Sequence, residues 1–487
     1  METIGRGAAM NEKMFNTEIA QRNSSIISFC LFSGWLLSFL FEGQVLYSIV
    51  EIAQIEGTAL IKSAVLTVFI GLFSSGFFIK NQAAAKITMI ISIIVCISAS
   101  LIFYLPFSAL WYIAIISSAY FASLFIASWG FYFKGFFNPE ERFKIAAEIL
   151  IYSNILMIIV NILTVSISAF MGLTITILAL AGALPFLFRL ESSFDLKAYN
   201  KKNTAVLPLR IPIISKPFTL LCLFILIITI DSGLMYQVVN PSFAQYELLN
   251  AYYWAIPYIL ALFILRNLSS KINKAYILYV AIAMIGFSYA LFMWLDRSVT
   301  SYLLINTLML GAFGVCDLFF WSILGSYLEY HDNAAQVFGV GMSMNVLGVL
   351  VGEVIGNRII HLKNPYFATS FTAVIIIFSV LIMLPVLNFQ LTRHLKEHEF
   401  LVKFADMAKS EQDKGIESFD KDKQLTGKEL EVVKLLLRGY TYKMIGESLF
   451  ISENTIKYHT KNIYQKLNIK SKTELIIKFG DNKELHQ

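Results

Sequence analysis

The chain has 487 residues, of which 57% are apolar and only 15% are charged, and its mean hydropathy is +0.66. This composition excludes a soluble globular protein, a disordered chain and a disulfide scaffold. The charge is uneven, because 33 of the 72 charged residues lie in the 97 residues from Leu391 onward. We therefore predict a large body in lipid, residues 24–390, followed by a smaller part in water.

Apolar runs long enough to cross a bilayer recur along the body. A spanning helix needs about 20 mostly apolar residues, because hydrocarbon offers the backbone no other hydrogen-bond partner. The reversal near Gly172 is the least distinct, since a kink would leave a similar pattern. We predict twelve spans, near residues 24–42, 58–79, 84–104, 108–131, 145–171, 173–190, 218–238, 247–265, 275–295, 301–326, 335–356 and 368–390.

Lysine and arginine concentrate in alternate loops, which predicts the orientation of the body. They are frequent after the second, fourth, sixth and eighth spans and rare in the opposite loops. One loop on the basic side, Glu329 to Asp332, contains neither. The pattern predicts that segment 1–23, the central loop from Glu191 to Pro217 and the tail all face the cytoplasm.

The central loop divides the body into six plus six spans. With the cytoplasmic termini, this pattern resembles the major facilitator superfamily, whose two six-helix halves enclose a cavity near the membrane midplane. Many members carry a G-x-x-x-D-x-x-G-R/K loop after the second span. Here that loop reads Ser75-Gly76-Phe77-Phe78-Ile79-Lys80-Asn81, without the acidic residue or the second glycine. The resemblance implies the fold, whereas the altered loop disfavours active transport.

Three carboxylates lie inside predicted spans, where ionisable groups are costly and therefore candidates for function. They are Asp231 in the seventh span, Asp317 in the tenth and Glu353 in the eleventh. Each is a candidate contact for a ligand or a proton, although a structural carboxylate or a position near the membrane interface is the more common explanation for such a residue. The eleventh span also carries Gly348, Gly352 and Gly356, whose spacing predicts close helix packing.

The chain changes character after the last span. Residues 391–424 are predicted to combine a charged cytoplasmic helix, to about Lys409, with a flexible polar tether. The remaining residues, 425–487, contain 11 basic and 7 acidic side chains. A small basic domain favours a nucleic-acid partner, although a solvated charged surface gives the same numbers.

Four helices are predicted in this last segment. Their boundaries are marked by a capping box at Thr426 and Glu429, a stop at Gly439, a start at Thr441 or Tyr442, a cap at Ser452 and a last start near Ser471. The second and third form a helix-turn-helix, whose second member enters the DNA major groove. Lysines on that helix can donate to guanine edges or to phosphates.

The motifs of this segment resemble the LuxR-type DNA-binding domain. The matching stretches are Leu425-Thr426-Gly427-Lys428-Glu429, Gly439-Tyr440-Thr441-Tyr442-Lys443-Met444-Ile445-Gly446, Leu449-Phe450-Ile451-Ser452-Glu453-Asn454-Thr455-Ile456-Lys457-Tyr458-His459 and Ile463-Tyr464-Gln465-Lys466-Leu467. The resemblance implies base contacts from Lys457, Tyr458 and Lys461, and phosphate contacts from Thr455 and His459. It also implies dimers on double-stranded DNA with two half-sites, often paired through the fourth helix.

The sequence thus predicts an all-α protein in which a major-facilitator-like bundle of about twelve helices precedes a four-helix DNA-binding domain. The arrangement resembles bacterial membrane-bound LuxR-type regulators with a facilitator-like N-terminal half. We expect a transcriptional regulator of the inner membrane whose body senses an unidentified small molecule. The alternative is a secondary transporter whose DNA-binding tail regulates its own synthesis. No catalytic cluster, cofactor motif or metal spacing is present in the sequence, so we expect neither an enzyme nor a cofactor.

Overall fold

In the computed structural model, every regular element of the described residues is a helix. The described residues are 2–484, except 42, 56, 193–214, 247–248, 251–252, 254, 269–273, 407–415 and 417–424. Most of the central loop and of the predicted tether therefore lies outside them. The chain divides into a body, Met1–Phe194 with Phe218–Leu384, and a second unit, Asp195–Pro217 with Pro385–Gln487. Each is considered by itself.

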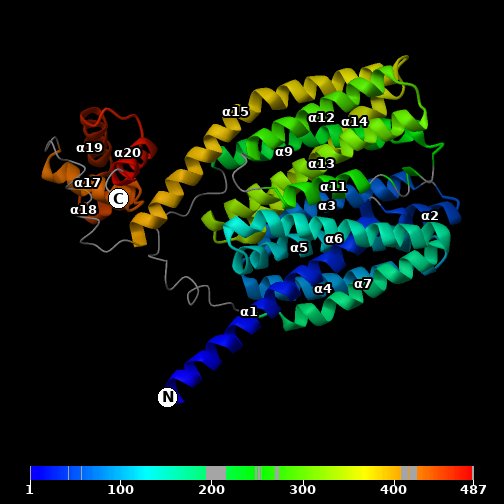
Figure 1. Ribbon diagram of the computed structural model, residues 1–487, viewed down its shortest axis with the longest axis horizontal. Coiled ribbons are helices and arrows are strands. Elements are labelled where there is room, and N and C mark those ends of the chain that lie inside the picture. Colours follow the sequence, from blue (N-terminus) through cyan, green and yellow to red (C-terminus); the bar gives the residue numbers. More distant parts are fainter. Residues whose placement is uncertain are drawn as a thin grey trace. The chain divides into compact units, whose positions relative to one another are not determined.

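The body is a bundle of long helices that run back and forth beside one another (Figure 1). Its first half contains α1 (Glu2–Trp35), η1 (Leu36–Phe41), α2 (Gln44–Ile52), α3 (Thr58–Phe78), α4 (Gln82–Leu101), η2 (Ile102–Tyr104), α5 (Ala109–Phe136), α6 (Pro139–Ser166) and α7 (Ala169–Arg189). Its second half contains α9 (Lys216–Leu234), η4 (Met235–Val239), η5 (Pro241–Phe243), α11 (Ala255–Arg266), α12 (Lys274–Trp294), α13 (Val299–Tyr327), η6 (Leu328–Tyr330), α14 (Ala334–Ile359) and α15 (Pro365–Asp406).

The predicted spans correspond to these helices, with three differences. Among the described residues, 11 helices are long and apolar enough to cross a membrane, and α11 is a shorter apolar helix in place of the predicted span 247–265. The chain reverses at Ile167 and Ser168 rather than near Gly172, which lies inside α7. The charged helix predicted after Leu391 is not separate, because α15 continues through Pro385 to Asp406.

The two halves share local features at matching places. The first helix of each half ends in a π-helical turn, η1 after α1 and η4 after α9. Such turns are rare and interrupt the regular hydrogen-bond ladder of a helix. Trp129 on α5 and Trp321 on α13, which occupy corresponding spans, have ring centroids 6.1 Å apart. These pairs indicate that the two halves repeat one architecture.

The glycine-rich face of α14 packs directly on α9. A Cβ atom at Gly352 would lie 2.2 Å from the carbonyl oxygen of Ile230 and 2.8 Å from the Cα atom of Gly233. A Cβ atom at Gly348 would lie 2.0 Å from the hydroxyl of Thr229. The spacing of these glycines therefore serves helix packing, as predicted, since only glycine permits such close backbones.

The second unit ends in four helices, namely α17 (Gly427–Leu437), α18 (Tyr442–Leu449), α19 (Glu453–Lys466) and α20 (Lys472–Glu484). The predicted apolar faces meet in one core, to which α17 contributes Val432 and Leu436 and α19 contributes Ile456 and Ile463. Ile416 also packs into this core. The four predicted helix starts agree with the structure within one residue, whereas the fourth helix, predicted to end at Phe479, continues to Glu484.

Replacing Gly352 by alanine tests the contact between α9 and α14. The added methyl group must displace backbone atoms, so we expect Gly352→Ala to destabilise the body by about 1–3 kcal/mol. Thermal unfolding of the purified protein in detergent measures this loss. The matched control is Gly135→Ala, because a Cβ atom there meets nothing within 4 Å. Equal melting temperatures for the two variants would contradict the packing role.

Candidate functional site

The helix-turn-helix is fixed by two side-chain caps and one left-handed residue. The hydroxyl of Thr441 accepts a hydrogen bond from the backbone N–H of Met444, which starts α18. The hydroxyl of Ser452 accepts one from the N–H of Thr455, which starts α19. Between them Phe450 has φ 57°, a conformation that ends α18 and turns the chain. These local interactions set the direction in which α19 leaves the turn.

The predicted DNA-contacting residues lie on α19. Lys457, Tyr458 and Lys461 are exposed, and Tyr458 retains 64% of its accessible surface. Thr455 and His459 beside them are half-buried. The opposite side of the helix carries Ile456 and Ile463, which are fully buried, so α19 is held by one face and presents the other. The five residues are therefore on or beside one presented surface.

An ion pair that sequence reasoning missed lies on the same surface. The ammonium of Lys457 is 2.8 Å from the carboxylate of Glu453, one turn earlier on α19, and both side chains are about half exposed. An exposed pair at this spacing contributes only a few tenths of a kcal/mol. The i,i+4 spacing was the available signal. The pair therefore holds Lys457 loosely and leaves it available to another anion.

Glu429 joins the ends of α17 and α19. Its carboxylate accepts hydrogen bonds from the N–H and the hydroxyl of Thr426, 2.7 and 2.9 Å away, which confirms the predicted capping box. The same oxygen lies 2.6 Å from the ammonium of Lys466. Burial raises the pKa of the Glu429 carboxyl, but the hydrogen bonds from Lys466 and Thr426 and the Lys466 charge outweigh it, and the pKa lies below its ordinary value. The ionised carboxylate is thus the form that stabilises this unit.

The three intramembrane carboxylates all lie in the second half of the body. Asp317 on α13 is half-buried and accepts a hydrogen bond from the hydroxyl of Tyr258, 2.9 Å away. Glu353 on α14 is half-buried and interacts electrostatically with Lys62. It follows Gly352 at the contact with α9. Asp317 and Glu353 therefore have partners of the kind that a structural role requires.

Asp231 differs from the other two. Its side chain on α9 is fully buried, and neither carboxylate oxygen has a hydrogen-bond partner within the described part of the chain. The hydroxyl of Tyr289 donates to its backbone carbonyl instead. Asp231 and Asp317 are both close enough to Cys316 to interact with it electrostatically. The structure thus brings these two carboxylates to one region of the second half, and Asp231 is the less satisfied of them.

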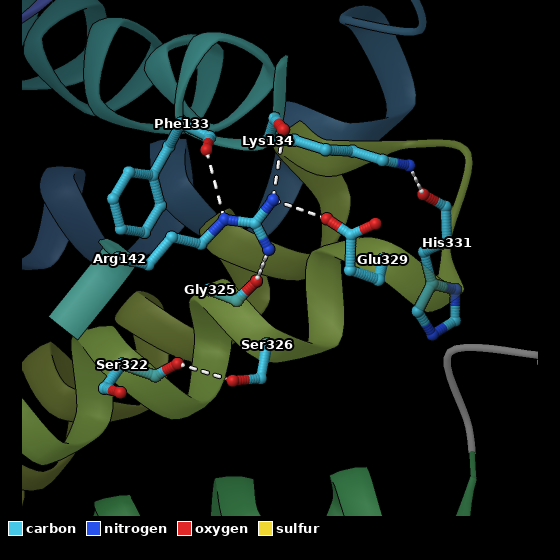
Figure 2. Close-up of polar contacts among 8 residues, drawn as sticks. All are labelled: Phe133, Lys134, Arg142, Ser322, Gly325, Ser326, Glu329 and His331. Atoms are coloured by element: carbon cyan, nitrogen blue, oxygen red, sulfur yellow. Dashed lines mark hydrogen bonds and ion pairs between the residues drawn. The ribbon is translucent and has the colours of Figure 1, made fainter. Parts of the chain in front are cut away.

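A cluster of polar contacts joins the two halves, and Figure 2 shows it. We call it the clasp and define it as Lys134, Arg142, Gly325, Glu329 and His331. The guanidinium of Arg142, whose side chain is only 1% exposed, donates to the carbonyls of Phe133, Lys134 and Gly325 and pairs with the carboxylate of Glu329. Lys134 donates to the carbonyl of His331 at 2.7 Å. The clasp therefore ties α5 and α6 of the first half to α13 and η6 of the second.

The clasp explains the loop that departs from the charge pattern. The segment Glu329 to Asp332 carries no lysine or arginine of its own, yet Glu329 and Asp332 both interact electrostatically with Lys134. The boundary between the two halves, which we call the seam, also has contacts between neutral groups, since Asn333 donates to the carbonyl of Gly76 at 2.9 Å. The first half of the body therefore supplies the positive charge, on Lys134, that interacts with the acidic loop of the second half.

Removing the acid of the clasp tests its role in holding the halves together. Glu329 is 39% exposed, so we expect Glu329→Gln to weaken the contact between the halves by only about 1 kcal/mol. The population in which the halves have separated at the clasp should then rise about fivefold. Ser75 is fully buried in the contact between α3 and α14. Maleimide labelling of a Ser75→Cys variant should therefore become about fivefold faster with Glu329→Gln. Glu140→Gln, an exposed carboxylate outside the clasp, is the control, and equal rates in both would count against the clasp.

The Glu429 carboxylate predicts a pH dependence for the second unit. Because its folded-state pKa lies below the ordinary value of 4.5, its stabilisation is present above that value and disappears as the pH falls through the folded-state pKa. In a fragment of residues 410–487, Glu429→Gln should lower the free energy of unfolding by about 1–2 kcal/mol at pH 7 and by much less below pH 4. Urea unfolding at several pH values measures this difference. The exposed Glu431→Gln is the control, and a deficit that does not change with pH would refute the assignment.

Comparison with known proteins identifies the four-helix domain at the end of the second unit. Residues 423–479 match the family described as bacterial regulatory proteins, luxR family. The chain is 47% identical over 53 residues to the transcriptional regulatory protein DegU of Brevibacillus brevis. The aligned segment makes up 11% of this chain and 22% of that protein. It is 48% identical over 52 residues to the oxygen regulatory protein NreC of Staphylococcus carnosus, and this segment makes up 11% of this chain and 24% of that one. The chain therefore spans about a quarter of the length of these relatives.

The body is similar in fold to solved transporters at 12% sequence identity. The human organic anion transporter MFSD10 (TETRAN) superposes with a TM-score of 0.56, over 74% of this chain and 99% of that one. The proton:xylose symporter XylE, of the major facilitator superfamily, gives 0.57, over 74% and 95%. A bacterial homologue of the iron transporter ferroportin in an outward-facing state gives 0.55, over 76% and 99%. The chain thus joins a membrane body with the major facilitator fold to a C-terminal DNA-binding domain of the LuxR type.

Proposed function

We propose that this protein is a membrane-anchored transcriptional regulator whose body senses a small molecule and controls the DNA-binding domain. The observation that carries the proposal is the fusion of a LuxR-type domain with an exposed recognition face to a body that has the major facilitator fold. Neither part is of a kind that typically performs catalysis, so we propose no enzymatic activity. The body holds the domain at the inner face of a bacterial cytoplasmic membrane, with the N-terminus and the central loop on the same side.

The recognition face of α19 supports a specific mode of binding. Inserted N-terminus first into a major groove, α19 brings Lys457, Tyr458 and Lys461 to base edges, while Thr455 and His459 reach phosphates. The ammonium of Lys457 exchanges the nearby Glu453 for DNA, and that exchange is inexpensive because the pair is exposed. One small domain makes few phosphate contacts, so two copies on two half-sites are needed for tight binding.

The surface of α20 limits how two copies pair. Leu475, Ile476 and Phe479 are buried in the core of their own domain. A dimer through α20 therefore uses its remaining face, which includes the exposed Lys478. This arrangement suits a weak, regulated contact better than an obligate one, because the apolar residues of the helix are already packed.

The clasp supports a way for the body to change state. A ligand can shift the body between two arrangements only if it binds them unequally. The clasp joins the halves through side chains that pair across the seam, so its opening is a discrete change in how the halves meet. A small molecule that binds one arrangement better alters the population with the clasp closed. That change is passed to the DNA-binding domain through α15 and the tether.

A second function, secondary transport with an autoregulatory tail, is favoured by one observation. Asp231 is a fully buried carboxylate without a hydrogen-bond partner among the described residues, and such groups often bind substrate or protons in membrane proteins. The altered loop at Ser75 to Asn81 argues against it. Uptake of labelled substrate into proteoliposomes separates the two functions, because a sensor alone accumulates none.

The lysines of α19 provide the direct test of DNA binding. In a fragment of residues 410–487, Lys457→Ala and Lys461→Ala should each weaken binding to the protein's own promoter region by about 1–3 kcal/mol. Binding should fall steeply with salt, because phosphate contacts release counterions. Fluorescence anisotropy at several salt concentrations measures both effects.

The control for these variants is Lys428→Ala, which removes the same charge from α17, where Lys428 pairs with Glu431 at 2.9 Å. Circular dichroism should show that all three variants stay folded, since these lysines are exposed. Promoter binding that survives both α19 substitutions, or that falls equally with Lys428→Ala, would overturn the assigned recognition face.

A further inference from the structure

A groove with a volume of about 460 Å³ runs along the seam between α6 of the first half and α11 of the second. Helix α6 contributes Ile151, Tyr152 and Ile155, which lie on one face at helical spacing. Helix α11 contributes a matching stripe that includes Leu260 and Phe263. The groove is therefore a product of two complementary apolar faces rather than a gap in the packing of one half.

The groove opens outward from the bundle. Tyr152, Leu260 and Phe263 are each at least 50% exposed, although they belong to helices that cross the membrane or lie within its thickness. Side chains at that depth that no protein covers are covered by lipid. The occupant of the groove is thus a component of the membrane.

The length of the groove matches one leaflet. Its lining on α11 extends from Ile256 to Arg266, and the ten steps between these residues rise about 15 Å along the helix. The hydrocarbon core of a bilayer is about 30 Å thick, so each leaflet contributes about 15 Å. One stretched acyl chain of a single leaflet therefore fits the groove from end to end.

A pair of charges marks one end of the groove. Arg266, in the last turn of α11, donates from Nε and Nη2 to a single carboxylate oxygen of Glu148, at 2.9 and 2.6 Å. These bonds use two of the five guanidinium donors, and the Arg266 side chain is 27% exposed. The charged end is therefore suited to an anionic headgroup.

We propose that this groove binds one anionic phospholipid, with an acyl chain along the apolar stripes and its phosphate on Arg266. The phosphate shares the guanidinium with Glu148 or displaces it. Because α6 and α11 belong to different halves, the bound lipid contacts both sides of the seam. The proposal stands apart from the regulatory function, since it requires neither DNA binding nor a soluble ligand.

Native mass spectrometry of the full-length protein tests the site. The purified protein is released from detergent that contains equal amounts of phosphatidylglycerol and phosphatidylcholine with the same acyl chains. We expect one phosphatidylglycerol to be retained several-fold over phosphatidylcholine. Arg266→Gln should abolish this preference. Arg358→Gln, an exposed arginine in the last turn of α14, is the matched control and should leave the preference intact.

Two further variants separate a lipid site from a structural ion pair. Glu148→Gln removes the competing carboxylate, so it should preserve or increase retention of phosphatidylglycerol. Leu260→Trp fills the groove and should reduce retention of both lipids. The proposal is overturned if Arg266→Gln keeps the preference for phosphatidylglycerol, if Glu148→Gln loses it, or if Leu260→Trp leaves the retention of both lipids unchanged.

Discussion

Hydrocarbon cannot solvate an ion or an unpaired backbone group, and the organisation of this protein follows from that constraint. It requires helices throughout the body and limits charged side chains to positions where another group satisfies them. Arg142 meets this requirement through three carbonyls and Glu329, and Arg266 meets it through Glu148. Asp231 is the notable exception among the described residues, which is why its position is the strongest argument for transport.

Two ion pairs also determine how the halves are coupled. The Arg142–Glu329 pair joins α6 to η6, and the Glu148–Arg266 pair joins α6 to α11, so both pairs cross the seam between the halves. When the halves move, an ion pair across the seam is either formed or broken. An apolar contact can instead adjust gradually, because it has no fixed partner atoms. The two pairs therefore favour discrete arrangements, as the proposed control of the DNA-binding domain requires.

The DNA-binding domain relies on a different balance. Its core is small, and Glu429 adds one shared ionic contact that joins the start of α17 to the end of α19. The proposed recognition face of α19 carries only weak, exposed interactions such as Glu453 with Lys457. Stability and recognition thus use separate residues, so changes in binding need not unfold the domain.

The pattern of residues along the chain is sufficient to predict the class of the body and where the helices of the DNA-binding domain begin. Apolar run length reports membrane helices directly, and the caps at Thr426, Thr441 and Ser452 act within one helical turn, so both could be predicted. The pairing of Arg142 with Glu329 and of Arg266 with Glu148 could not be predicted in this way, because these partners are 187 and 118 positions apart and meet only in the folded chain. Local pattern carries no information about which helix faces another across a seam. For the same reason the sequence could nominate Asp231, Asp317 and Glu353 as equals, whereas packing left only Asp231 without a partner among the described residues.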